Sequence, residues 1–280
     1  WKVRSGEGDA FMLHVGGEDG LELTADGVEG GESIALEHVS DNLPRATLSK
    51  FPHLVGYDAL RLREDKLAMV PGYLKRQLAV SVRGADGVVK DATALQLPGV
   101  LDDLFAYDGP LGVTWDGEVP TVSVWAPTAQ NVWLHLFDTS DAPEPGEVRE
   151  MTESDGVWSV TGDPSWKNKF YVYEVKVFMP QTGNVERNVA TDPYSRSLSM
   201  NSRRSQIVDL EDPALKPEGW DDVVKPSLEA PEDIVIYELH VRDFSATDPT
   251  VPMTDTMAMA RTAPRASPMS DPTTPRMSAW

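Results

Sequence analysis

Alternating apolar and polar residues mark the segment VSVWAPTAQNVWLHLFD, residues 122–138. In its first half, Val122 and Val124 alternate with Thr121, Ser123 and Trp125. In its second half, Val132, Leu134 and Leu136 alternate with Trp133, His135 and Phe137. A period of two residues on both sides of a short polar connector, APTAQN, is typical of two antiparallel strands with one face on a core. The pattern predicts part of a β-sandwich.

Similar short strands occupy most of the chain. An N-terminal β domain, residues 1–108, is predicted from segments at 11–15, 21–24, 33–39, 59–62 and 77–82, with glycine and acidic turns between them. A second β domain, residues 109–217, adds segments at 157–160, 170–178 and 206–210. Between the two groups, Pro98–Tyr107 carries apolar residues at helical spacing after a proline, which predicts a short connecting helix.

The pattern changes after residue 217. KPEGWDDVVKPSLEAPED is polar and rich in proline, as expected of a linker. IVIYELHV, residues 234–241, carries apolar residues on both faces, which is typical of a parallel strand buried on both sides. We expect residues 218–252 to hold the linker and this strand.

Residues 253–280 have a different composition. They contain five of the ten methionines and no Leu, Ile, Val, Phe, Tyr, Gly, Lys or Glu, so they have almost nothing to bury in a core. We expect a disordered tail, produced by a shift of reading frame near Pro252. A natural disordered tail is the alternative, and the other two frames of the DNA distinguish the two.

Composition narrows the choice of partners. The net charge of −20 disfavours nucleic acid and anionic membranes, whose phosphates it repels. The absence of cysteine excludes disulfides and thiolate metal sites. No segment reaches the roughly 18 apolar residues of a membrane span. The chain begins at Trp1 without a signal-peptide pattern, so we expect any targeting segment to be missing or removed.

A resemblance to a known family extends over much of the chain. FAYDGPLGVTWDG (105–117) and the run to Asp138 resemble the starch-type carbohydrate-binding module of amylopectin-debranching enzymes. The same order of segments is similar to limit dextrinase, or type I pullulanase, from about Phe51 to Val251. The segments are LQLPGVLDDLFAYDGPLG (95–112), GVWSVTG (156–162), YVYEVKVF (171–178), ATDPYSRSLSMNSRRSQIVDL (190–210), LKPEGWD (215–221) and IVIYELHVRDFSA (234–246).

The resemblance implies a mainly β fold: two β-sandwich-like domains, then the truncated start of a (β/α)₈ barrel whose first strand is 234–241, then the disordered tail. It implies a parent α-1,6-glucosidase that acts on pullulan and limit dextrins. A barrel needs about 250 residues, whereas 48 follow Glu232. We therefore expect no catalytic residue in this chain. Glu238 and Asp243 are the acidic residues nearest that strand, and we expect them to face solvent or support it.

We expect no metal or cofactor. The acidic turn region from Glu18 to Glu32 lacks the ligand spacing of a calcium loop. The five histidines are widely separated and lack metal-ligand spacing; they are His14, His38, His53, His135 and His240. No phosphate-binding glycine loop and no serine nucleophile elbow occurs.

The remaining candidate chemistry is α-glucan binding, to amylopectin, limit dextrin or pullulan. Exposed Trp and Tyr rings stack on sugar faces. The tryptophans considered are Trp115, Trp133, Trp158 and Trp166, of which Trp133 and Trp166 are the chosen candidates. Two alternatives stay open: a free-standing glucan-binding module, and a non-functional fragment in which unpaired 234–241 promotes aggregation. A plant or algal source would imply the plastid stroma.

Overall fold

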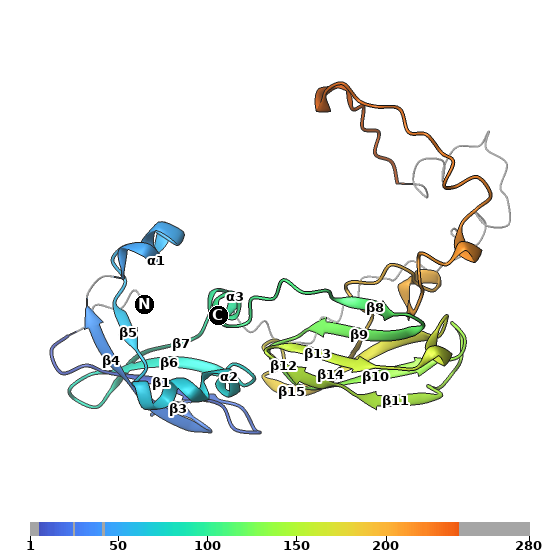
Figure 1. Ribbon diagram of the computed structural model, residues 1–280. Helices are drawn as coiled ribbons and strands as arrows, with labels where there is room; N and C mark the ends of the chain where they lie inside the picture. Colours follow the sequence, from blue (N-terminus) through green and yellow to red (C-terminus); the bar gives the residue numbers. More distant parts are fainter. Residues whose placement is uncertain (1–5, 25, 41–42, 241–280) are drawn as a thin grey trace, which may run out of the picture. The chain divides into compact units, whose positions relative to one another are not determined.

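The structure is a computed structural model that describes residues 6–24, 26–40 and 43–240. It consists mainly of antiparallel sheets, as predicted (Figure 1). Residue contacts divide the chain into two compact units, Trp1–Leu215 and Lys216–Trp280.

The first sheet of unit one has five strands in the order β5-β4-β1-β6-β7. Their bounds are Ala10–Val15 (β1), Glu32–Ser40 (β4), Ala59–Arg61 (β5), Leu78–Arg83 (β6) and Val89–Ala94 (β7). A separate hairpin pairs Glu22–Thr24 (β2) with Gly27–Glu29 (β3). Each of the five strand segments predicted before residue 83 overlaps one of these strands.

Alternation in β1 shows why this sheet forms a core. Phe11, Leu13 and Val15 are at most 5% exposed, because every second residue of a strand faces the same side.

Short helices lie in the connections of this sheet and after it: Arg45–Lys50 (α1), Val70–Tyr73 (α2) and Pro98–Leu104 (α3). The predicted helix at 98–107 is thus confirmed over its first two turns. Phe105 ends this helix and belongs to the buried cluster that contains Leu13 and Val15.

His14 occupies the opposite face of β1 and is also buried. Its Nδ1 lies 2.9 Å from Ser33 Oγ and its Nε2 lies 2.7 Å from Ser81 Oγ. Burial lowers the pKa of His14, because it penalises the charged imidazolium, and the positive charge of Arg83 lowers it further. The folded chain therefore takes up this proton less readily than the unfolded chain.

This pKa shift predicts a pH effect on stability. The contribution of neutral His14 is complete above the ordinary pKa of about 6.5 and is lost as the pH falls below that value. Between about pH 7.5 and about pH 5.5, the free energy of unfolding should fall more in the wild type than in His14→Gln, as measured by urea denaturation at each pH. His53→Gln, at an exposed position, should keep the wild-type dependence. An identical pH dependence in wild type and His14→Gln would contradict this assignment.

The second group of strands forms a sandwich of two sheets. One sheet has the order β12-β13-β9-β8, with Gly112–Asp116 (β8), Val119–Trp125 (β9), Thr152–Ser154 (β12) and Val157–Thr161 (β13). The other has the order β11-β10-β14-β15, with Ala129–Phe137 (β10), Glu147–Glu150 (β11), Phe170–Met179 (β14) and Asn184–Ala190 (β15). A short strand, Ser205–Gln206 (β16), also pairs with β14. Figure 1 shows these strands in two layers.

The two strands of segment 122–138 differ from the prediction in their partners. β9 pairs with β8 and β13, whereas β10 pairs with β11 and β14. The connector, closed by a hydrogen bond from Ala129 N to Ala126 O (3.0 Å), thus leads from one sheet to the other and forms no hairpin. Alternation fixes which face of a strand is buried, but it does not fix which strand lies beside it.

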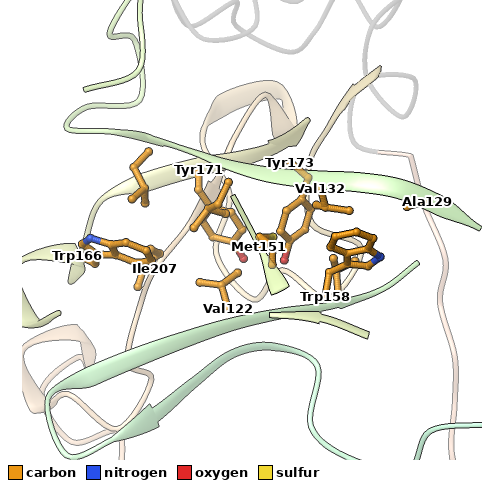
Figure 2. Close-up of a cluster of buried hydrophobic side chains, with 12 residues drawn as sticks. Val122, Ala129, Val132, Met151, Trp158, Trp166, Tyr171, Tyr173 and Ile207 are labelled. Atoms are coloured by element: carbon orange, nitrogen blue, oxygen red, sulfur yellow. The ribbon is translucent and has the colours of Figure 1, made fainter. Parts of the chain in front are cut away.

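Apolar side chains of both sheets fill the space between the layers. Val122 and Trp158 come from one sheet and Val132, Tyr171 and Tyr173 from the other, and all five are buried (Figure 2). Leu134 and Leu136 complete the inward row of β10. The predicted inner faces of β9 and β10 are therefore confirmed at these valines and leucines.

The described part of unit two contains one short 3₁₀ turn, Pro231–Asp233. Lys216 Nζ lies 3.1 Å from Asp221 Oδ1. Residues 234–240 are exposed, Val235 by 93%, and they form no ladder with any strand of the described chain. A parallel strand is buried only when neighbouring strands and helices cover it, so the first barrel strand stays a prediction. Val241 and the predicted tail at 253–280 lie outside the described residues.

Candidate functional site

Trp133 lies on the outer face of the sheet that contains β10. Its neighbours Val132 and Leu134 are fully buried, so the alternation of the strand turns the indole away from the core. Glu150 on β11 and Glu174 on β14 stand opposite Trp133 in the ladders. The indole is therefore flanked by carboxylates on both neighbouring strands.

Three charged or titratable side chains form a chain of contacts that begins at this indole. The guanidinium carbon of Arg187, on β15, lies 4.3 Å from the ring centroid of Trp133. Arg187 Nη1 donates to Glu174 Oε1 at 2.7 Å, and Glu174 Oε2 lies 2.9 Å from His135 Nε2. Glu174 thus holds the arginine over the ring. We call Trp133, His135, Glu174 and Arg187 the Trp133 face.

The Trp133 face combines an aromatic ring with hydrogen-bonding groups. A planar guanidinium offers donors in a fixed fork, and a carboxylate offers acceptors. A sugar ring presents hydroxyl groups that both donate and accept, around an apolar ring face. Arg187 covers one side of the indole, at a gain of about 0.5–1 kcal/mol for an exposed cation–π contact. A ligand that stacks on that side has to displace it.

Trp166, the second predicted sugar platform, is a core residue. Its side chain is 1% exposed and packs in the cluster between the sheets, close to Ile207 (Figure 2). A Cβ atom at Gly162 would lie 2.3 Å from its ring. The ring has no face open to a sugar in this structure, because backbone and core side chains enclose it.

The indoles of the two other candidate tryptophans both donate hydrogen bonds to backbone carbonyls. Trp158 is 5% exposed, and its Nε1 donates to Ala126 O at 3.0 Å. Trp115 is half-buried, and its Nε1 donates to Val208 O at 3.3 Å. Of the four tryptophans, Trp133 alone lies on the outer face of its sheet.

A buried polar cluster around Asp192 was not predicted from the sequence. Asp192 Oδ2 accepts hydrogen bonds from Tyr171 (2.6 Å) and Tyr173 (3.1 Å), and Oδ1 accepts from the backbone N of Tyr194 (2.7 Å). Burial raises the pKa of the Tyr171 phenol, and the charge of Asp192 raises it further. Both tyrosines therefore remain neutral donors. The Asp-Pro pair at 192–193 was the available signal, but it indicates only a turn.

Catalytic and metal-binding candidates gain no support from the geometry. Glu238 is exposed, and Asp243 lies outside the described residues. Across residues 6–24, 26–40 and 43–240, no three side chains of His, Asp or Glu come together as a possible metal-ligand set. Among the histidines, His135 pairs with Glu174, and His38 lies 3.6 Å from Asp58.

In the part of the chain that the structure describes, no helix combines the length and the apolar character needed to cross a bilayer.

Comparison with known proteins assigns both groups of strands. Residues 1–103 match the pullulanase N2 domain, and residues 110–195 match carbohydrate-binding module 48, the isoamylase N-terminal domain. These matches fall on the two groups of strands described above. The chain carries the N-terminal domains of pullulanases.

Individual pullulanases agree with this assignment. The chain is 42% identical to pullulanase 1, chloroplastic, of Arabidopsis thaliana. This alignment extends over 254 residues and covers 90% of this chain. The chain is 38% identical over 214 residues to pullulanase of Klebsiella pneumoniae, which covers 72% of this chain. A crystal structure of K. pneumoniae pullulanase complexed with maltotriose superposes with a TM-score of 0.75 at 34% identity, over 87% of this chain and 23% of that one. The predicted resemblance to this family is thereby confirmed.

The chain is much shorter than these relatives. It spans 26% of the Arabidopsis pullulanase and 19% of the Klebsiella pullulanase. The matched part holds the N-terminal domains only.

Proposed function

We propose that this chain supplies the N-terminal domains of a starch-debranching α-1,6-glucosidase, and that its module binds α-glucan through the Trp133 face. The observation that carries the proposal is the match of residues 110–195 to carbohydrate-binding module 48. The outward indole with its arginine and glutamate adds a surface suited to a neutral sugar. The maltotriose complex of the Klebsiella relative supports an α-glucan as the ligand class.

The cleavage step belongs, in this proposal, to a barrel domain that follows these domains in the longer protein. A retaining glycosidase places two carboxyl groups about 5–5.5 Å apart across the scissile bond. In barrel enzymes these groups come from the C-terminal ends of several strands. The role proposed for the described domains is therefore to hold glucan near the enzyme.

Removing the indole tests the binding proposal. Trp133→Ala should raise the dissociation constant for β-cyclodextrin or maltoheptaose about tenfold or more, which corresponds to about 1.4 kcal/mol. Isothermal titration calorimetry on the 280-residue chain measures this change. Trp220→Ala is the matched control, because Trp220 is 62% exposed and lies outside the matched module. Equal affinities for wild type and Trp133→Ala would contradict a role for this face.

Substitution of Arg187 is a second test of the same binding proposal. Arg187→Ala should uncover the indole while removing donors, so we expect a smaller change in affinity than for Trp133→Ala. Trp133→Phe should retain part of the affinity, because an aromatic ring remains available for stacking.

The plastid is the proposed location if the source is a plant or an alga. Support comes from the Arabidopsis relative, whose name places it in the chloroplast.

A further inference from the structure

A hollow of about 320 Å³ opens beside β8, and its wall includes none of the residues of the Trp133 face. Its wall comprises Val113–Trp115, Tyr171, 194–196, Gln206 and 208–211. We propose that this β8 hollow is a second α-glucan subsite, which takes a short malto-oligosaccharide unit. The inference rests on the proposed function, since it presumes a glucan-binding module.

Several contacts fix the shape of the β8 hollow. The indole of Trp115 donates to the carbonyl of Val208 and ties that segment to β8. Gly112 has a φ of +79°, and a Cβ there would lie 3.0 Å from Tyr194 Cβ. Glycine thus lets the Tyr194 segment close on the start of β8. Asp192 holds both Tyr171 and the backbone of Tyr194, so the wall is built into the fold.

The side chains of the β8 hollow match the chemistry of a sugar. Tyr194 and the half-buried Trp115 supply aromatic surface for the apolar face of a pyranose ring. Among the described residues, the guanidinium of Arg196 and the carboxylate of Glu211 have no hydrogen-bond or ion-pair partner. Donors and acceptors that are otherwise unused therefore line the same hollow.

Charge and size narrow the ligand class. One cation, Arg196, and two carboxylates, Asp209 and Glu211, line the hollow, and this excess of negative charge opposes phosphorylated sugars. Small-molecule sites measure about 300–1,000 Å³, and this hollow lies at the lower limit. A neutral unit of one or two glucose rings fits these conditions better than a long glucan helix or an anion.

The experiment compares paired variants of the whole 280-residue chain. Tyr194 and Arg196 are exposed, so the variant with Tyr194→Ala and Arg196→Ala should fold, with thermal unfolding as the check. Calorimetric titration with maltotriose should show two sites in the wild type and one each in this variant and in Trp133→Ala. Combining the three substitutions should abolish binding. Tyr107→Ala is the matched control, because Tyr107 is 42% exposed against 38% for Tyr194.

The outcomes separate this inference from the proposed function. Binding that Trp133→Ala abolishes and the Tyr194–Arg196 variant leaves unchanged would overturn the β8 subsite alone. Binding lost only in the Tyr194–Arg196 variant would support the β8 subsite and overturn the role of the Trp133 face. No heat from the wild type at millimolar maltotriose would overturn both. Tighter binding of glucose 6-phosphate than of maltose would also contradict the neutral ligand class.

Discussion

Replacing Asp192 by alanine should lower the free energy of unfolding by about 3–5 kcal/mol. Asp192 is 4% exposed and accepts two tyrosine hydroxyls and one backbone N–H. Without the carboxylate, the hydroxyls of Tyr171 and Tyr173 would remain buried with an acceptor removed. Leaving buried polar groups unpaired costs about 1–3 kcal/mol each. Chemical denaturation followed by tryptophan fluorescence measures the loss.

Asp192→Asn is the informative control for this prediction. Asparagine keeps one acceptor oxygen and nearly the same volume, but its amide group donates where Asp192 accepts. We expect a loss smaller than that of Asp192→Ala. A loss under about 1 kcal/mol for Asp192→Ala would show that the two hydroxyls find other partners.

Trp166→Ala should destabilise the module by about 3–5 kcal/mol, the usual cost of removing a large buried aromatic side chain. The indole is enclosed between the sheets and lies against Gly162, so truncation leaves a cavity that rigid strands cannot close. Unfolding in guanidinium, monitored by circular dichroism, measures this loss.

Substitutions of two further tryptophans provide comparisons for the stability loss of Trp166→Ala. Trp220→Ala should change stability by no more than about 0.5 kcal/mol, because its side chain is exposed. Trp133→Ala should fall between the two, since it loses the cation–π contact with Arg187 but no core packing. If Trp166→Ala weakened glucan binding and left stability unchanged, the core assignment of Trp166 would be wrong.

The same contrast shows how far the sequence could predict the candidate site. Trp133 sits inside a strict alternation, so its outward direction follows from Val132 and Leu134 facing inward. Trp166 lies in a 3₁₀ turn, Pro164–Trp166, where no period of two applies. Its burial depends on nearby Gly162 and on Ile207, which approaches it from far along the chain. Local sequence carries no record of that approach.

The contact between Arg187 and Trp133 and the β8 hollow could not be predicted from the sequence, for a related reason. Arg187 meets Trp133 across two ladders, β10 to β14 and β14 to β15. The wall of the β8 hollow joins residues 113–115 to residues 194–211. Strand register and loop closure decide which residues become such neighbours. A shift of the register by one residue would bring different residues together.

The sequence by itself determined the mainly β character of this protein, the buried faces of β9 and β10, the position of α3 and the resemblance to pullulanases. It did so because period-two alternation and turn residues are local properties of the chain. Only the tertiary structure decided that β9 and β10 belong to different sheets, that Trp166 is core, and that Asp192 joins two tyrosines. These features depend on which strands pair and on what covers each ring, and both arise from contacts between residues far apart in the sequence.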